Sequence, residues 1–235
     1  MSKNNAIISF EGLDCSFKET NYKKYTFHLR EMRGDYFKIH KESFPRYGNW
    51  SAMGVEKWLN GSFDRDVLKA HPTAVNSLYC MDRFSYWYET CEDGTRRIDL
   101  LNDKDNYHYF VFDRYTLSNF IYNPIYPNEV NYNDFNFDKD LFAIPHADVT
   151  VWMRMNNFDV LSKLIAQKEN KDKNELDTDF LRKVWERSEK IISSDIFEKS
   201  GIRLVVVECL NPDGTTRDKK DLADYIWGAV CRSIR

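Results

Sequence analysis

The sequence lacks long apolar runs and closely spaced cysteines. No run approaches the roughly 20 apolar residues of a membrane-spanning helix, so we expect no membrane as a partner. The five cysteines are odd in number, far apart and without a CxxC pair. This pattern favours reduced thiols in the cytoplasm over a disulfide framework. Residues 1–5 lead directly into a strand-like segment, which predicts that there is no secretory signal.

An excess of positive charge is also lacking. The chain has 34 Lys and Arg against 37 Asp and Glu, a net charge of −3. We therefore expect no nucleic-acid polymer as a partner and only local phosphate binding. With few glycines and prolines and no low-complexity linker, the 235 residues predict one domain, 1–235. A chain of this length buries a sizeable core without disulfides or a structural metal.

Apolar and β-branched runs alternate with helical patterns along the chain. The strand-like runs are Ala6–Glu11, Tyr107–Asp113, Val149–Met153 and Ile202–Glu208, with a weaker one at Tyr36–His40. The helical patterns cover Lys18 to about Arg33, Pro72 to about Thr90, Asp179 to about Lys199, and Lys219–Arg235. Such alternation predicts an α/β fold, a doubly wound parallel sheet of about five strands flanked by helices. Two stretches look like insertions, Asn123–Pro145 and Lys168–Thr178.

The loop after the first strand has the outline of a phosphate-binding loop. Gly12 and Lys18 have the spacing of G-x-x-x-x-G-K-[ST], between a strand and a helix whose N-terminus favours anions. Phe17 stands where the second glycine belongs, and Glu19 stands where the Mg²⁺-binding hydroxyl belongs. The alternative is a polar loop that only joins strand to helix. The candidate loop residues are Gly12, Asp14, Cys15, Ser16, Phe17, Lys18, Glu19 and Thr20.

Two arginines further along the chain, Arg46 and Arg83, are candidate ligand-binding residues. Arg46 lies in Ser43–Tyr47 behind Phe44, and its planar guanidinium can grip a phosphate with two hydrogen bonds. Tyr79 and Arg83 are four apart on a predicted helix and share a face. The alternatives are a solvated loop arginine and an ordinary amphipathic helix.

The stretch that begins at Asp113 ends a buried strand and opens a helix. Asp113 and Arg114 form a charged pair at the carboxyl end of a strand, where α/β sheets bind ligands. A purely structural ion pair is the alternative. The polar or aromatic residues that follow are Tyr115, Ser118, Tyr122 and Asn123.

Together these stretches resemble the thymidylate kinase family over nearly the whole chain. The matching family patterns are F-E-G-x-D-x-x-G-K-x-T, F-P-x-R, L-[FY]-x-x-[DN]-R and D-R-Y-x-x-S-x-x-A-Y-Q, with Asn123 in place of the last Gln. The resemblance implies a P-loop nucleoside monophosphate kinase that uses ATP and Mg²⁺ to convert dTMP to dTDP, and it implies a homodimer. Residues 168–178 would be the lid, with Lys168, Lys171 and Lys173 in place of the usual arginines or, alternatively, as plain solvated surface.

The resemblance also implies roles for the candidate residues. The eight candidate loop residues named above would bind ATP, and Asn211–Gly214 would lie beside its adenine. The catalytic set would be Lys18, Arg46, Asp113 and Arg114, with Glu19 and Asp113 as the candidate Mg²⁺ ligands. The acceptor would contact Asp14, Phe44, Arg46, Tyr79, Arg83, Arg114, Tyr115, Ser118, Tyr122 and Asn123.

Two other functions remain open from the sequence. A deoxynucleoside kinase would need a carboxylate base for a sugar hydroxyl, and Glu42 is a candidate. A non-catalytic nucleotide-binding module would fit the altered loop, in particular the carboxylate of Glu19 beside the phosphates. The retained pair Asp113–Arg114 argues against this module, because binding alone does not need it.

Overall fold

Five parallel strands form the central sheet of the computed structural model, which describes residues 5–33, 37–64, 71–122, 131–169 and 177–233. The strand order is β2-β3-β1-β4-β5, and every neighbouring pair is parallel. The strands are β1 (Ala6–Gly12), β2 (Phe37–Ser43), β3 (Tyr107–Asp113), β4 (Val149–Arg154) and β5 (Arg203–Glu208). The predicted parallel α/β sheet is therefore confirmed, including the weak second strand.

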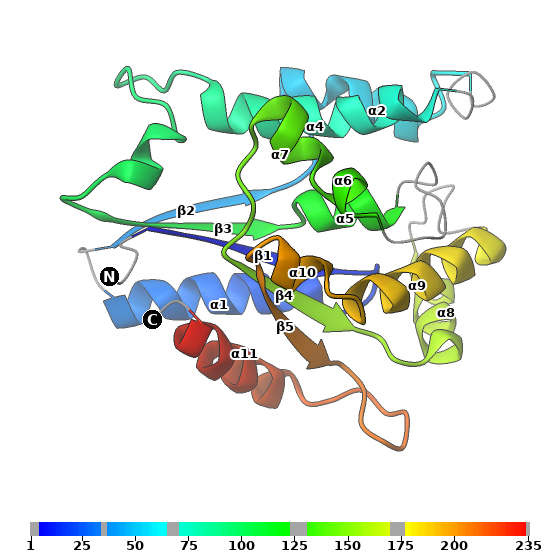
Figure 1. Ribbon diagram of the computed structural model, residues 1–235. Helices are drawn as coiled ribbons and strands as arrows, with labels where there is room; N and C mark the ends of the chain where they lie inside the picture. The colour runs from blue at the N-terminus through cyan, green and yellow to red at the C-terminus, as the bar shows by residue number, and fades with distance from the viewer. Residues whose placement is uncertain (1–4, 34–36, 65–70, 123–130, 170–176, 234–235) are drawn as a thin grey trace.

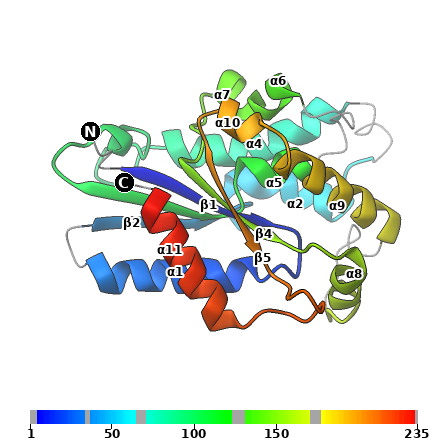
Figure 2. The same cartoon turned by 60° about the horizontal axis from the view of Figure 1, so that its bottom comes forward.

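Helices cover both faces of this sheet. α1 (Lys18–Arg33) and α11 (Lys219–Ser233) pack side by side below it, and the other helices lie mainly above it (Figures 1 and 2). The remaining helices are α2 (Met53–Leu59), α4 (Pro72–Tyr88), α5 (Thr116–Tyr122), α6 (Tyr132–Phe135), α7 (Phe137–Phe142), α8 (Phe158–Ala166), α9 (Thr178–Ile192) and α10 (Ile196–Lys199), with short 3-10 turns η2 (Trp50–Ala52) and η3 (Asp99–Asn102). The sheet is thus doubly wound.

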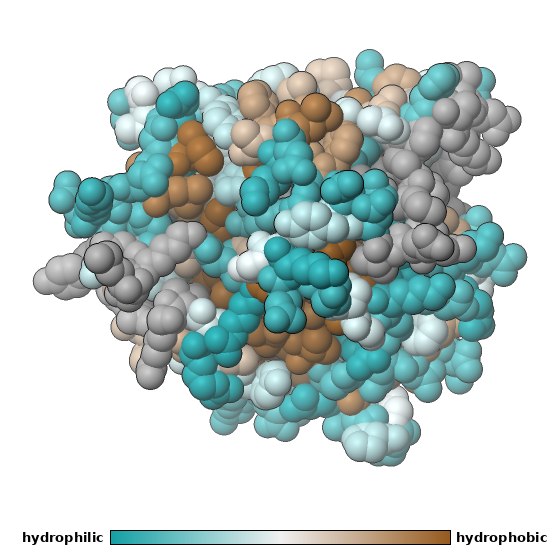
Figure 3. Space-filling view, viewed as in Figure 1, coloured by the Kyte–Doolittle hydropathy of each residue, from teal (hydrophilic) through white to brown (hydrophobic). Residues whose placement is uncertain are grey.

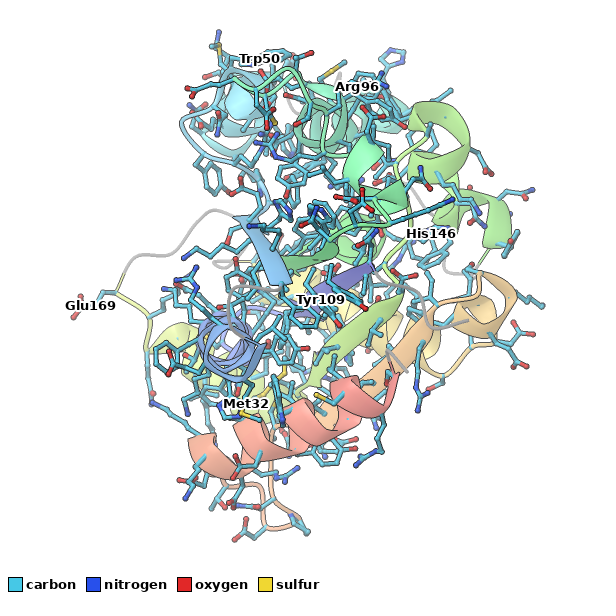
Figure 4. The ribbon with its side chains drawn as sticks, turned by 90° about the vertical axis from the view of Figure 1, so that its left-hand side faces the viewer. Met32, Trp50, Arg96, Tyr109, His146 and Glu169 are labelled. Carbon is cyan, nitrogen blue, oxygen red and sulfur yellow. The ribbon has the colours of Figure 1, made fainter. Side chains whose placement is uncertain are left out.

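The core explains why the central strands are almost wholly apolar. All of β1 is buried, and its alternate residues face opposite sides. Ile8 and Phe10 pack in the cluster that includes the α1 side chains, whereas Ile7 packs with Trp87 of α4 and Phe110 of β3. A strand covered on both faces needs apolar residues at every position. Figure 4 shows the same layers from the side, with Met32 of α1 at the bottom, Tyr109 of β3 in the middle, and Trp50 and Arg96 at the top.

The surface seen in Figure 3 is largely polar, with apolar side chains gathered over α4 and α7 at the top. Leu141 of α7 and Met81 and Phe84 of α4 are among the exposed large apolar residues. In the part of the chain that the structure describes, no helix combines the length and the apolarity that crossing a membrane requires.

One predicted helix is divided in the structure. The pattern Asp179–Lys199 forms α9 and α10, which are separated by residues 193–195. The Ser194 hydroxyl donates to the carbonyl of Ile191 at 2.7 Å, a local bond that competes with helix continuation. The helices α2, α6, α7 and α8 were not predicted. Two of them, α6 and α7, lie inside the insertion-like stretch Asn123–Pro145.

Candidate active site

The sheet brings the three charged loops of the sequence to one edge. β1, β2 and β3 are parallel, so Gly12, Ser43 and Asp113 end their strands at the same side. The Arg114 backbone N–H donates to the Phe10 carbonyl at 2.9 Å. The Phe44 N–H donates to the Asp113 carbonyl at 3.0 Å. Carboxyl ends of parallel strands are where α/β sheets bind ligands.

The loop after β1 is tight, and two of its non-glycine residues have a left-handed backbone. A Cβ on Gly12 would lie 2.5 Å from Ser16 Oγ and 3.0 Å from the Met153 carbonyl, so only glycine fits. Phe17 takes the place of the second glycine and has φ +61°, in the left-handed region that glycine adopts most readily. Cys15 has φ +60°. Such strain costs on the order of 1–3 kcal/mol per residue and is concentrated at functional sites.

Lys18 and Asp113 form a buried ion pair at this edge. Lys18 Nζ donates to Asp113 Oδ1, and both side chains are about one-tenth exposed. Burial lowers the pKa of Lys18, and Arg114 lowers it further, against the opposing effect of Asp113. The cation and the carboxylate therefore compensate each other's charge in this buried pair.

Arg114 and Asp14 form a second pair beside the first. Arg114 Nη2 donates to Asp14 Oδ1, and the Arg114 backbone is left-handed with φ +62°. Burial raises the pKa of Asp14, but Arg114, Lys18 and Lys168 outweigh it and hold that pKa below the ordinary value. The Tyr122 hydroxyl accepts from the Asp14 backbone N–H at 3.2 Å, and its ring lies 5.2 Å from the Arg114 guanidinium carbon. Sequence-distant candidates thus meet in one cluster.

Ser118 is bonded to a carboxylate that sequence reasoning missed. Its backbone N–H donates to Glu11 Oε2 at 3.2 Å, and its hydroxyl donates to the same oxygen. Glu11 is fully buried, and burial raises its pKa to about 7, although the Ser118 bond and the cations Arg114 and Lys18 oppose the rise. Glu11 Oε1 has no hydrogen-bond partner among the described residues. Glu11 had no separate signal in the sequence, since it reads as the last residue of an apolar strand.

Arg46 is held by a network of buried polar groups. It is 6% exposed, and Asp82 accepts from its backbone N–H at 2.7 Å and from its Nε at 2.9 Å. Arg46 Nη2 donates to Ser51 Oγ at 2.8 Å and to Ser85 Oγ at 2.9 Å. The neighbouring Phe44 ring is core, with Phe112, Tyr86 and Tyr115 as ring neighbours.

Arg83 has its own buried aspartate. Arg83 Nε donates to Asp138 Oδ2 at 2.8 Å, and Cys80 Sγ contacts the other oxygen of that carboxylate at 3.0 Å. The Tyr115 hydroxyl donates to the Pro145 carbonyl at 2.7 Å, which fixes Tyr115 in the core. Tyr79 is half-buried on the same helix, α4. Arg83 thus meets a carboxylate from α7, far along the sequence.

The remaining candidates lie at the rim or outside the described residues. Glu19 is exposed and pairs with Lys23 one helical turn away, and the Lys23 hydrogen bond lowers the pKa of Glu19. Thr20 is half-buried. Lys168 is exposed but close enough to lower the pKa of Asp14. Asn123, Lys171 and Lys173 lie outside the described residues.

The residue after β5 contacts the loop after β1. Cys209 Sγ lies 3.4 Å from the Ser16 carbonyl, two residues before the loop Asn211–Gly214. That loop closes with Asp213 accepting from the Thr215 backbone N–H at 2.9 Å, and it leads into α11 (Figure 1). None of the five cysteines, all within the described ranges, forms a disulfide there.

The acidic groups suit a cation that is held jointly with a ligand. Over the described ranges, no three or more His, Cys, Asp or Glu side chains come together as a metal-binding group. Mg²⁺ is usually bound by one or two carboxylates together with substrate phosphates rather than by such a cage. The Asp113 carboxylate, at the strand end beside Lys18, is a donor of the right kind.

One of three comparisons with known proteins, the comparison with solved structures, bears on this architecture. The chain matches no protein-family model and no curated protein. It is similar to the crystal structure of thymidylate kinase from Ehrlichia chaffeensis, with a TM-score of 0.61 and 16% sequence identity. The similarity covers 98% of this chain and 99% of that one, so it extends over the sheet, the helices and the loops alike. The chain therefore has a thymidylate kinase-like fold.

Proposed function

We propose that the chain is a nucleoside monophosphate kinase that transfers the γ-phosphoryl group of ATP to a deoxynucleoside monophosphate, with dTMP giving dTDP. One observation carries the proposal. Two cation–carboxylate pairs, Lys18–Asp113 and Arg114–Asp14, meet at the sheet edge directly behind a phosphate-type loop. A reaction between two phosphate-bearing substrates requires such charges, because phosphoryl transfer depends mainly on positioning and electrostatic stabilisation.

In this proposal the loop after β1 and Lys18 bind the phosphoryl donor. The loop amides and the Lys18 ammonium would hold the outer phosphates of ATP, with Asp113 freed from Lys18 to take a Mg²⁺ ligand position. Mg²⁺ would supply charge neutralisation between the phosphates. The pairing of Glu19 with Lys23 weakens its repulsion of a triphosphate, and its place in the first turn of α1 keeps it available as a second ligand. The loop Asn211–Gly214 would face the adenine.

In this proposal the acceptor binds at the same edge of the sheet, on the side away from the donor. Arg114 and Arg46 would hold the acceptor phosphate, which is already an anion near neutral pH and needs no general base. Asp14 would contact the sugar, and Tyr122 beside it would crowd a ribose 2′-hydroxyl. Tyr79 would stack on the base, with Arg83 and Asn123 at its polar edge. Phe44, Tyr115 and Ser118 would support this pocket rather than contact the acceptor, since their partners are protein groups.

We also propose that the protein is located in the cytoplasm, where its thiols stay reduced. The resemblance to the thymidylate kinase family further implies a homodimer. The proposed function competes with a nucleoside kinase that uses Glu42 as a base. In the structure, Glu42 Oε1 accepts from the Ser43 backbone N–H at 3.1 Å.

Steady-state kinetics with Arg46→Ala test the assignment. A charge-assisted contact to phosphate is worth roughly 1.5–3 kcal/mol, so the acceptor kcat/KM should fall about ten- to a hundredfold. The KM for ATP should stay within about twofold of the parent value. The unmutated chain should prefer deoxy to ribo monophosphates. A loss of ATP affinity with an unchanged acceptor KM would mean that the two substrate sites are assigned the wrong way round.

A further inference from the structure

The aspartate before Arg83 has no role in the chemistry described so far, although it is among the most buried charges of the chain. Asp82 is 1% exposed and lies on α4, 36 residues from its partner Arg46. Its two carboxylate oxygens accept three hydrogen bonds. Oδ2 accepts from the Arg46 backbone N–H at 2.7 Å, and Oδ1 accepts from Arg46 Nε at 2.9 Å and from the Ser51 hydroxyl at 2.7 Å.

The hydrogen bonds that Arg46 makes within the described ranges use two of its three guanidinium nitrogens. Nε is taken by Asp82, and Nη2 is shared by Ser51 Oγ, Ser85 Oγ and the Asp82 carbonyl. Nη1 makes no hydrogen bond among the described residues, and it is not among their fully buried unsatisfied atoms. A guanidinium has five N–H donors in a rigid plane, so fixing Nε and Nη2 also fixes the direction of the two remaining donors on Nη1.

Stability alone does not explain this arrangement. Replacing a buried Arg–carboxylate pair by well-packed apolar residues is often neutral or stabilising, because desolvation offsets the attraction. The Arg46–Asp82 network is built of four polar side chains from three elements, namely Arg46 after β2, Ser51 of η2, and Asp82 and Ser85 of α4. What it does supply is a single orientation for Arg46.

We propose that Asp82 is a positioning residue for the acceptor site, holding Arg46 so that Nη1 alone presents its two donors to a phosphate monoester. The proposal rests on the proposed function and deepens it, since it names the atom that meets the acceptor and the residue that orients it. Arg46 is the group that touches the acceptor, whereas Asp82 acts only through Arg46. The ligand class is a terminal phosphate monoester such as that of dTMP.

Binding of dTMP, measured calorimetrically on the full chain without turnover, tests the proposal. In Asp82→Asn only the single amide oxygen can still accept a hydrogen bond, so one of the two bonds that hold Arg46 is lost. The affinity for dTMP should therefore fall about tenfold, while the affinity for ATP stays within about twofold. In an Arg46→Ala background the same change should have no further effect on dTMP affinity, because Arg46 is the only route by which Asp82 acts. The matched control is Asp99→Asn, which breaks the exposed pair with Arg96 and should leave both affinities unchanged.

Two results would overturn the positioning role. One is an unchanged dTMP affinity in a folded Asp82→Asn variant, and the other is an equal loss in the parent and Arg46→Ala backgrounds. If Asp82→Asn loses cooperative unfolding, Ser51→Ala replaces it. This variant removes only the hydroxyl that bonds both Arg46 and Asp82, and about a threefold loss is expected. A chain that binds dTMP through Arg46 and Asp82 but transfers no phosphoryl group would support the positioning role and refute the proposed kinase.

Discussion

At the scale of single residues, four of the cations singled out in the sequence each have an aspartate partner. The pairs are Lys18–Asp113, Arg114–Asp14, Arg46–Asp82 and Arg83–Asp138. Two of these aspartates were in the predicted site, and two, Asp82 and Asp138, were not. The charges of each pair therefore balance one another. A phosphate has to compete with a carboxylate for Lys18 and for Arg114, whereas Asp82 bonds Arg46 through the backbone N–H and Nε and leaves Nη1 to the proposed ligand.

Lys18→Ala should reduce both activity and stability, and a second substitution should restore only the stability. Transfer should be lost, because the donor phosphates lose their lysine. The free energy of unfolding should fall by about 3 kcal/mol, since the buried Asp113 carboxylate loses its cation. Adding Asp113→Asn should restore most of that stability in urea denaturation but none of the activity. Near-full activity of Lys18→Ala would show that this loop is not a donor site.

Glu11 should make stability depend on pH in a defined window. The folded chain keeps the Glu11 proton up to a pKa of about 7, whereas an ordinary glutamate releases it near 4.5. Between these values the unfolded chain binds fewer protons, so this group's contribution to stability falls as pH rises, by roughly 3 kcal/mol in all.

The comparison with Glu11→Gln isolates this effect, because the amide stays neutral and its oxygen can still accept from Ser118. The two proteins should unfold at similar urea concentrations at pH 5, and the variant should be the more stable at pH 8. Parallel pH profiles for the two proteins would mean that Glu11 does not hold its proton in the folded chain.

Motifs could locate the cations of the site but not their partners. Arg46, Arg83 and Arg114 stand in short patterns that a sequence reveals directly. Asp138 lies 55 residues from Arg83, and only the packing of α7 on α4 brings them together. The burial of Glu11 could not be predicted either, since a charged residue at a strand end normally reaches solvent.

At the scale of elements, the strands were the most predictable part. Their runs are apolar because both sheet faces are covered, and their ends agree with prediction within a few residues. The helix α8 was missed although Phe158, Leu161 and Ile165 have helical spacing and all are buried. Its start signal is Asn157, whose side chain accepts from the Asp159 N–H at 3.0 Å and the Val160 N–H at 3.2 Å.

Removing that cap should weaken α8 by a measurable amount. Asn157→Ala should lower the free energy of unfolding by about 1 kcal/mol, because two backbone N–H groups lose their acceptor. Asn157→Ser should recover most of the loss in urea denaturation, since serine is a comparable cap. If the alanine and serine variants are equally stable, the side-chain cap contributes nothing.

At the scale of the whole molecule, the topology explains why one edge of the sheet carries the candidate site. The chain passes from β1 to β2 and back through β3 before it crosses β1 to β4, so β1 lies at the centre of the sheet. The loops after β1, β2 and β3 therefore lie side by side, and Cys209, directly after β5, contacts the loop after β1. The chain shares its fold with a thymidylate kinase over 98% of its length, and a shared fold does not identify the acceptor.

Transfer of label from [γ-³²P]ATP, in the presence of Mg²⁺, tests the central claim most directly. dTMP and thymidine, offered separately, form a matched pair that differs only in the phosphate for which Arg46 and Arg114 are proposed. The account predicts labelled dTDP from dTMP, no labelled product from thymidine, and no transfer by Lys18→Ala. Labelled product from thymidine but not from dTMP would contradict the account in favour of a nucleoside kinase, and no labelled product from either acceptor would contradict it altogether.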